Sequence, residues 1–271
     1  MTTDLAELGE LAEALATEAG ELVEEMRAPL AIDGLEANAT TKSSPGDLVT
    51  AADRAAERAI IDGIVATRPT DAILGEEGGQ RAGTSGVRWL VDPIDGTTNY
   101  VYDIASYSVS IAAEVDGVLS VGVVYNPKTD TMFSGLIGSG ARRNGVTISC
   151  STASDLGTAL VATGFGYVAE RRRGQAEVLA HLLPEIRDIR RFGSAALDLC
   201  AIACGQVDAY YERGLNPWDL AAGTVIAREA GATVGDLRGG QPSPEFVLAA
   251  NPALFLELRE RLTDLAADQR P

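Results

Sequence analysis

The sequence predicts an α+β protein in which helices cover β-sheets, and three observations support this prediction. Near the N-terminus, apolar residues recur at spacings of three and four, as in an amphipathic helix. In the middle of the chain, two apolar runs flank Asp116-Gly117, which is a strong β-hairpin signal. After about residue 150, strand-like and helix-like segments alternate. We therefore expect two closely packed parts, residues 1–150 and 151–271, each with a sheet covered by helices.

The first part begins with two predicted helices, over residues 4–27 and from about Leu48 to Thr67. Short apolar runs then predict strands at 72–75 and 87–92, and an acidic residue lies at the end of each. The hairpin that follows continues into a further strand from Thr131, so this region is an antiparallel meander and not a series of βαβ units.

Glycines break up the end of the meander. The segment GSGARRNG, residues 138–145, does not fit the G-x-G-x-x-G fingerprint of a dinucleotide-binding loop and predicts a turn. In the second part, strands are expected at 160–165, 189–193, 207–212, 232–236 and 246–250. Helices are expected at 174–188, 194–205 and 217–231, and from Pro252 onward.

The charge balance disfavours two classes of partner. The chain carries 39 acidic and 22 basic side chains, a formal net charge of −17. We therefore expect neither general nucleic-acid binding nor docking on an anionic membrane surface. The basic runs Arg171–Arg173 and Arg190–Arg191 are interpreted as a solvated face, an interface or the rim of a substrate pocket.

We expect a cytoplasmic protein. The N-terminal residues lack the basic and apolar regions of a secretory signal, and no stretch of about 20 apolar residues is present to span a bilayer. The three cysteines, Cys150, Cys200 and Cys204, form no CxxC pair and their odd number fits no closed disulfide framework.

Several classes of catalysis lack their residues. His181 is the only histidine and has no nucleophile motif beside it, which disfavours a Ser-His-Asp hydrolase and a His-rich zinc site. The chain has two lysines, Lys42 and Lys128, and no G-x-x-x-x-G-K-[ST] motif, which excludes P-loop chemistry. Any catalysis must therefore depend on carboxylates, hydroxyls and metal ions.

The segment DPIDGTTN, residues 92–99, places two carboxylates across a tight turn. Asp92 and Asp95 are three residues apart, so both reach one point, and such hard oxygen ligands suit Mg²⁺. The alternative is that each aspartate binds nearby backbone N–H groups in an Asx-turn. Further acids also have ordinary local roles, in a strand-end loop or at a helix start: Glu76, Asp219, Asp47 and Asp53.

Together these segments resemble the inositol monophosphatase family. The resemblance covers nearly the whole chain, through KSSPGDLVTAAD, GEEGG, WLVDPIDGTTNYV, GSAALDLC, DAYYERGLNPWDLAAG and EAGATV, in that order. The pair DPIDGTTN and WDLAAG is the most specific part. The resemblance implies the alternating αβαβα sandwich of the inositol monophosphatase and fructose-bisphosphatase type.

The resemblance also implies a metal site of two or three Mg²⁺ ions. Glu76, Asp92 and the carbonyl of Ile94 correspond to the ligands of a first ion. Asp92, Asp95 and Asp219 correspond to those of a second, with Asp92 bridging. A third, weaker ion near Glu76 is held mostly by water in the family.

Further roles follow from the same resemblance. Thr97 and Asp53 correspond to the pair that helps deprotonate the attacking water, and Glu76 orients that water. The corresponding phosphate and polyol contacts are Gly96, Thr97, Thr98, Ser194, Ala195 and Glu212. Lys42 and Asp47 match positions beside the site.

The expected function is Mg²⁺-dependent hydrolysis of a small phosphate monoester, with inositol 1-phosphate as the foremost substrate. Divalent cations reverse the local charge that would otherwise repel a phosphate dianion. Histidinol phosphate, fructose 1,6-bisphosphate or a 3′-phosphonucleotide are alternative substrates on the same scaffold. A regulatory binding protein with dispensable catalysis is the alternative from another class. The resemblance further implies lithium sensitivity and a homodimer.

Overall fold

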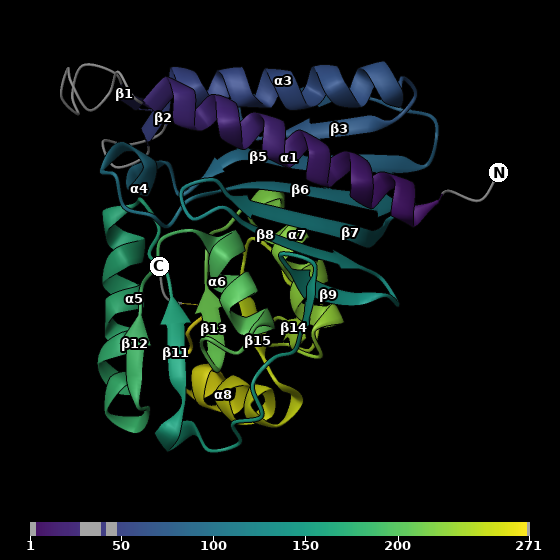
Figure 1. Cartoon of the computed structure of the whole chain (residues 1–271). Helices are drawn as coiled ribbons and strands as arrows, with labels where there is room; N and C mark the ends of the chain where they lie inside the picture. Colours follow the sequence, from purple (N-terminus) through teal and green to yellow (C-terminus); the bar gives the residue numbers. More distant parts are fainter. Residues whose placement is uncertain (1–3, 28–38, 42–47, 270–271) are drawn as a thin grey trace.

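The computed structural model describes residues 4–27, 39–41 and 48–269, and these form stacked layers of helix, sheet, helix, sheet and helix (Figure 1). Four apolar clusters fill the four spaces between neighbouring layers. This arrangement confirms the predicted αβαβα sandwich. Lys42 and Asp47 lie outside the described residues.

The outer layer on one side consists of α1 (Leu5–Arg27) and α3 (Ala51–Thr67), which lie side by side on the first sheet (Figure 1). The predicted first helix is confirmed. The predicted second helix begins three residues later than expected, because Leu48–Thr50 pairs as β2 with β1 (Ala39–Thr41). Thr50 is the N-cap of α3, and its side chain accepts hydrogen bonds from the helix N–H groups of Ala52 and Asp53.

The first sheet has the strand order β10-β9-β8-β7-β6-β5-β3-β4. Its strands are β3 (Ala72–Gly75), β4 (Gln80–Arg81), β5 (Val87–Asp95), β6 (Ser108–Val115), β7 (Val118–Asn126), β8 (Thr131–Leu136), β9 (Gly140–Arg143) and β10 (Val146–Ile148). Only β3 and β5 pair in parallel; the other neighbours are antiparallel, as the meander predicted. The hairpin turn at Asp116-Gly117 is confirmed, with φ of 51° and 82°, as a two-residue turn of this twist requires.

Two expectations for this sheet were wrong. Residues 138–145 are not only a turn, because β9 lies within them and pairs with both β8 and β10. The strand that was expected to end at Asp92 continues to Asp95, with a shift of register against β6 between these two residues. That irregularity allows both aspartates to lie at the same end of the sheet.

The middle layer consists of α6 (Ala195–Ala203) and α7 (Pro217–Glu229), which pack between the two sheets (Figure 1). Small residues permit a close approach of α7 to the first sheet. A Cβ added at Gly122 of β7 would lie 2.3 Å from the carbonyl oxygen of Ala222 on α7. The backbone of α7 is therefore held directly against β7.

The second sheet has the order β12-β11-β13-β15-β14, with β11 parallel to both its neighbours and the remaining pairs antiparallel. Its strands are β11 (Leu160–Thr163), β12 (Asp188–Arg190), β13 (Ala209–Glu212), β14 (Thr233–Gly235) and β15 (Val247–Ala250). Residues of one strand face opposite layers in turn: Tyr210 packs toward α6 and α7, whereas Tyr211 packs toward the outer helices. Both faces of the sheet are thus covered.

The second outer layer consists of α5 (Ala169–Leu182) and α8 (Pro252–Asp264). Pro252 opens α8 as predicted. The helix expected over 174–188 instead begins five residues earlier and gives way to a short 3₁₀ helix at Leu183–Glu185, where Pro184 lacks the N–H that an α-helix needs. The other short helices are α4 (Thr97–Val101) and a 3₁₀ helix at Leu156–Thr158.

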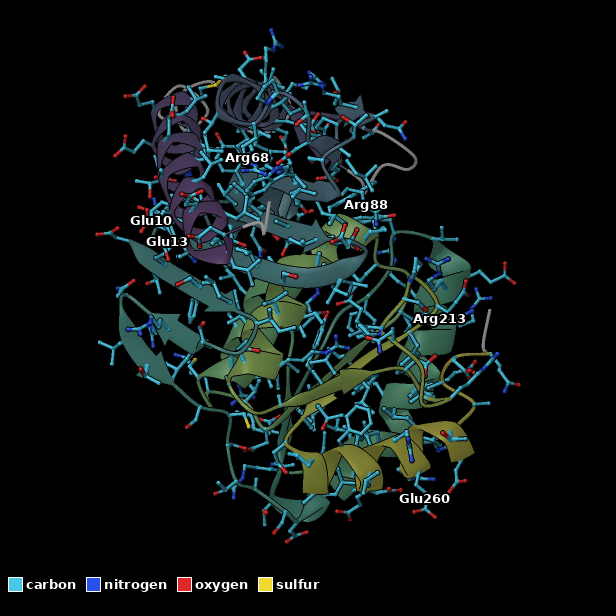
Figure 2. The ribbon with its side chains drawn as sticks, turned by 90° about the vertical axis from the view of Figure 1, so that its right-hand side faces the viewer. Glu10, Glu13, Arg68, Arg88, Arg213 and Glu260 are labelled. Carbon is cyan, nitrogen blue, oxygen red and sulfur yellow. The ribbon has the colours of Figure 1, made fainter. Side chains whose placement is uncertain are left out.

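The acidic excess lies partly on the outside of these layers. Glu10 is on the exposed face of α1 and Glu260 is on that of α8 (Figure 2). No helix in the described part of the chain is both long enough and apolar enough to cross a membrane. The division of the chain at residue 150 stays a prediction.

Candidate active site

The end of β5, the start of α4 and the start of α7 meet at one pocket of about 320 Å³. Its wall includes strand ends and loops from both sheets. The charged residues that line it are Glu76, Asp92, Asp95, Arg171, Arg191, Glu212 and Asp219. The four carboxylates predicted as metal ligands therefore face a single pocket.

The two aspartates of the DPIDGTTN segment are held by different partners. Asp92 is 2% exposed, and its Oδ1 accepts a hydrogen bond from the Ile94 N–H at 3.0 Å. Oδ2 of Asp95 accepts from Ser194 Oγ at 2.6 Å and from the Ala196 N–H at 2.7 Å, at the start of α6. The chain then turns at Gly96, whose φ of 93° favours glycine, and α4 begins.

Asp219 is fixed by the start of α7. It is the third residue of the helix, and its Oδ2 accepts the N–H of Asn216 at 2.6 Å. Asn216 in turn caps the helix, which completes a capping box. The hydrogen bond between Asp219 and Asn216 therefore has two effects. It caps α7, and it holds the Asp219 carboxylate toward the pocket.

Glu76 lies in the turn after β3, and a buried carboxylate on α3 anchors this turn. Glu57 is 5% exposed and accepts hydrogen bonds from the N–H groups of Glu77 at 2.7 Å and Gly79 at 3.0 Å. The N–H of Glu76 donates to Val91 of β5 at 3.2 Å. The turn that presents Glu76 is therefore fixed from both the helix and the sheet.

Burial and mutual repulsion make these carboxylates reluctant to ionise together. Burial raises the pKa of Asp92 well above its usual range, and the charges of Glu76, Asp95 and Asp219 raise it further. Burial and Asp95 raise the pKa of Asp219 in the same way. Burial also raises the pKa of Asp95 to about 6, although its hydrogen bonds from Ser194 and α6 oppose this change.

The donor set fits Mg²⁺ in its chemistry. Carboxylates and the carbonyl of Ile94, which also lines the pocket, are hard oxygen ligands, and a cation would offset the repulsion among them. In the described residues, however, no three Asp, Glu, His or Cys side chains are grouped as a metal ion would require. Binding would have to draw the carboxylates together, and the ligand assignments stay predictions.

Thr97 and Asp53, predicted as a proton-transfer pair, are in contact. Thr97 Oγ1 lies 3.1 Å from Asp53 Oδ1 and 3.1 Å from the carbonyl oxygen of Ile94. Its single proton serves one acceptor at a time. Asp53 Oδ2 accepts from the N–H of Thr50 at 2.7 Å and from its hydroxyl at 2.6 Å. Burial raises the pKa of Asp53 to about 6, and these bonds from Thr50 limit the rise.

The predicted substrate contacts fall into two groups. Gly96, Thr97, Ala195 and Glu212 line the pocket. Ser194 is fully buried behind Asp95 and Thr98 is not part of the pocket wall, so neither is placed as a direct contact. Burial raises the pKa of Glu212 to about 7, and a hydrogen bond from Tyr210 at 2.8 Å opposes this rise.

The sequence reasoning missed several residues at this site. Glu57 lies four residues after Asp53 on a predicted helix, so its place on the same face was a usable signal. Asn99 donates to the carbonyl oxygens of Ser106 at 2.6 Å and Phe192 at 2.7 Å, which ties α4 to the second part of the chain. No local pattern identifies that role, because its two acceptors are 7 and 93 residues away.

The comparisons with known proteins agree with this architecture. A family model described as the inositol monophosphatase family matches residues 4–270. The inositol-1-monophosphatase of Mycobacterium leprae is 47% identical over an alignment of 276 positions, gaps included, which covers 94% of each chain. The Nus factor SuhB of Salmonella typhimurium is 40% identical over 240 residues, 86% of this chain and 89% of that relative.

A solved structure extends the comparison to three dimensions. The crystal structure of the extragenic suppressor protein suhB from Bartonella henselae matches with a TM-score of 0.88 at 33% identity, and the match covers 94% of this chain and 98% of that one. Identities of this size over nearly complete chains exceed what a shared fold alone requires. The chain belongs to the inositol monophosphatase family of phosphatases.

Proposed function

We propose that this protein is a Mg²⁺-dependent phosphomonoesterase that hydrolyses inositol 1-phosphate to myo-inositol and phosphate. One observation carries the proposal: Glu76, Asp92, Asp95 and Asp219 line the same pocket as Thr97, which contacts Asp53. Family membership supports phosphatase chemistry, and the name of the Mycobacterium leprae relative supports the inositol substrate.

Metal binding defines the phosphate end of the pocket. The residues that would hold two or three Mg²⁺ ions are Glu76, Asp92, Asp95, Asp219 and Ile94, the last through its carbonyl. When bound, the ions supply positive charge that polarises the phosphoryl oxygens and eases formation of hydroxide and alkoxide. N–H groups at Gly96 and Thr97 would add hydrogen bonds to those oxygens.

The residues of the chain then direct the proton transfers. The attacking water donates to Thr97 Oγ1, and Thr97 passes its own proton to Asp53, whose pKa of about 6 suits a base near neutral pH. The water oxygen bonds to phosphorus as the ester P–O bond breaks on the opposite side. A water beside Asp219 gives a proton to the departing alkoxide. Glu212 would hold the polyol hydroxyls.

The direct test is phosphate release from inositol 1-phosphate with Mg²⁺ and with EDTA. We expect release that depends on Mg²⁺ and falls by at least 100-fold in Asp92→Asn, which retains the shape of the side chain. Undiminished release by this variant, or full release in EDTA, would show that the metal assignment is wrong. Calorimetric titration of Mg²⁺ into both proteins gives a second readout, the number of ions bound. A parallel panel with histidinol phosphate, fructose 1,6-bisphosphate and a 3′-phosphonucleotide compares substrates.

Further properties of the protein that we propose are tested separately. We infer inhibition by lithium and a homodimer, as the family resemblance suggests, and separately a cytoplasmic location. Assays with added LiCl and light scattering after gel filtration test the first two of these. The name of the Salmonella typhimurium relative, a Nus factor, favours a binding role as the second candidate function. Equal capture of partners by the wild-type protein and Asp92→Asn would indicate a role that does not need catalysis.

A further inference from the structure

The three arginines of the run Arg171–Arg173 have different surroundings. Arg171, in the first turn of α5, is half-buried and lines the pocket. Arg172 is exposed and donates to the carbonyl oxygen of Tyr167 at 3.0 Å, and Arg173 is exposed. Only the first member of the run therefore presents its charge to the active-site pocket.

Two glycines make room for the Arg171 side chain along the pocket wall. A Cβ added at Gly166 would lie 2.8 Å from Arg171 Cδ, and one added at Gly214 would lie 2.1 Å from its Nη1. Both glycines line the same pocket. The guanidinium thus lies beside the segment that connects Glu212 with Asp219, where the part of a substrate beyond its phosphate would lie.

In the part of the chain that the structure describes, no side chain pairs with the charge of Arg171. Within the described ranges, its guanidinium makes no hydrogen bond and no ion pair, although a guanidinium has five N–H donors. Arg191, the other arginine of the pocket, differs in this respect. Burial raises the pKa of Asp95, Asp198 and Glu212, and the charge of Arg191 opposes each rise, so acidic side chains already surround this arginine.

We propose that Arg171 forms a subsite for a second anionic group, so that the pocket binds polyol or sugar phosphates with a further phosphate or carboxylate. The inference rests on the proposed function, because the carboxylate end of the pocket must receive the first phosphate. A guanidinium binds either oxyanion through two parallel N–H bonds. The chain has a net charge of −17, so an arginine on the pocket wall that pairs with no acid of the described residues strongly favours binding of such an anionic group.

Competition kinetics with a matched pair of ligands test the subsite. Fructose 1,6-bisphosphate and fructose 1-phosphate differ only in the second phosphate, and each is measured as a competitor of inositol 1-phosphate hydrolysis in Mg²⁺. For the wild-type protein we expect at least tenfold tighter inhibition by the bisphosphate. Arg171→Gln should abolish this difference between the two fructose phosphates. Arg171→Lys, which retains charge without the planar fork, should show an intermediate preference.

Arg173→Gln is the matched control, because it removes the same charge from the same helix outside the pocket, and it should retain the wild-type preference. Equal inhibition by the two fructose phosphates in the wild-type protein would overturn the proposal, as would an unchanged preference in Arg171→Gln with native melting temperature. If the wild-type protein does not hydrolyse inositol 1-phosphate, the proposed function fails separately. In that case, calorimetric titration of the same proteins gives the dissociation constants of the two fructose phosphates. The ratio of these constants then tests the subsite in place of the ratio of inhibition constants.

Discussion

Replacement of Glu57 by glutamine tests whether α3 positions the turn that carries Glu76. The buried Glu57 carboxylate accepts two backbone N–H groups, from Glu77 and Gly79. A glutamine side chain has nearly the same size but offers one oxygen and one NH₂ group. One of the two N–H groups would therefore face another donor and lose its acceptor.

The cost follows from the hydrogen bond that is lost. A hydrogen bond to a charged group contributes about 1.5–3 kcal/mol, and a buried N–H left without a partner costs a similar amount. For a chain of this size, about 1 kcal/mol corresponds to roughly 2–4 °C in melting temperature. We expect Glu57→Gln to lower the melting temperature by about 3–12 °C. Its apparent Mg²⁺ affinity should fall by about 10–100-fold, as for other partners that orient metal ligands.

Scanning calorimetry and the Mg²⁺ dependence of phosphate release measure the two effects. Asp62→Asn is the matched control, because it changes a carboxylate to an amide on an exposed position of the same helix. Glu57→Asp, which retains the charge on a shorter side chain, should recover part of the Mg²⁺ affinity. If Glu57→Gln melts like the wild-type protein and needs no additional Mg²⁺, the anchoring role is refuted. A lower melting temperature with an unchanged Mg²⁺ dependence would show that Glu57 stabilises the fold but does not position Glu76.

Three further predictions concern other parts of the site. Thr97→Val should lower kcat by about 100-fold or more, because it removes the hydroxyl between water and Asp53. Thr97→Ser should retain most of the rate. Equal rates for Thr97→Val and the wild-type protein in single-turnover assays would contradict the proton relay. Gly122→Ala should destabilise the protein by about 1–3 kcal/mol in urea titrations and raise the Mg²⁺ requirement, because the new Cβ pushes against α7, which carries Asp219. The pKa of Glu212 is raised from 4.5 to about 7, so the folded state holds this proton more tightly than the unfolded chain. Stability of the protein in EDTA should therefore fall as the pH rises from about 4.5 to about 7, and Glu212→Gln should show a smaller difference in melting temperature between pH 5 and pH 8.

Strong local patterns made part of the fold predictable. The apolar periodicity of α1 and the Asp116-Gly117 turn each specify a structure within a few residues, and both were confirmed. β9 was missed because its glycine and two exposed arginines resemble a turn, whereas its pairing with β8 and β10 stabilises it. The end of α5 was predicted too late although Pro184 marks it, because the prediction extended the helical pattern past this proline.

The site was only partly predictable. Asp92 and Asp95 are close in sequence, so their proximity follows from the turn between them. Asp219 lies more than 120 residues further along the sequence, and its approach to these aspartates depends on the packing of α7 against the first sheet. Only the family resemblance predicted that approach. Arg171 was indistinguishable from its neighbours in the sequence, because its distinct role comes from the space left by Gly166 and Gly214.

The layers of the fold contribute separately to the pocket. Asp92 extends from the first sheet, Asp219 from the middle helices and Glu212 from the second sheet. Among the described residues, no single layer contains all the groups that we propose to contact phosphate, leaving group and polyol. A chain cut after residue 150 should therefore be inactive as separate fragments and regain phosphatase activity only when the fragments reassociate. Activity would then serve as a sensitive reporter of reassembly, since a small displacement between layers would separate the groups that must act together.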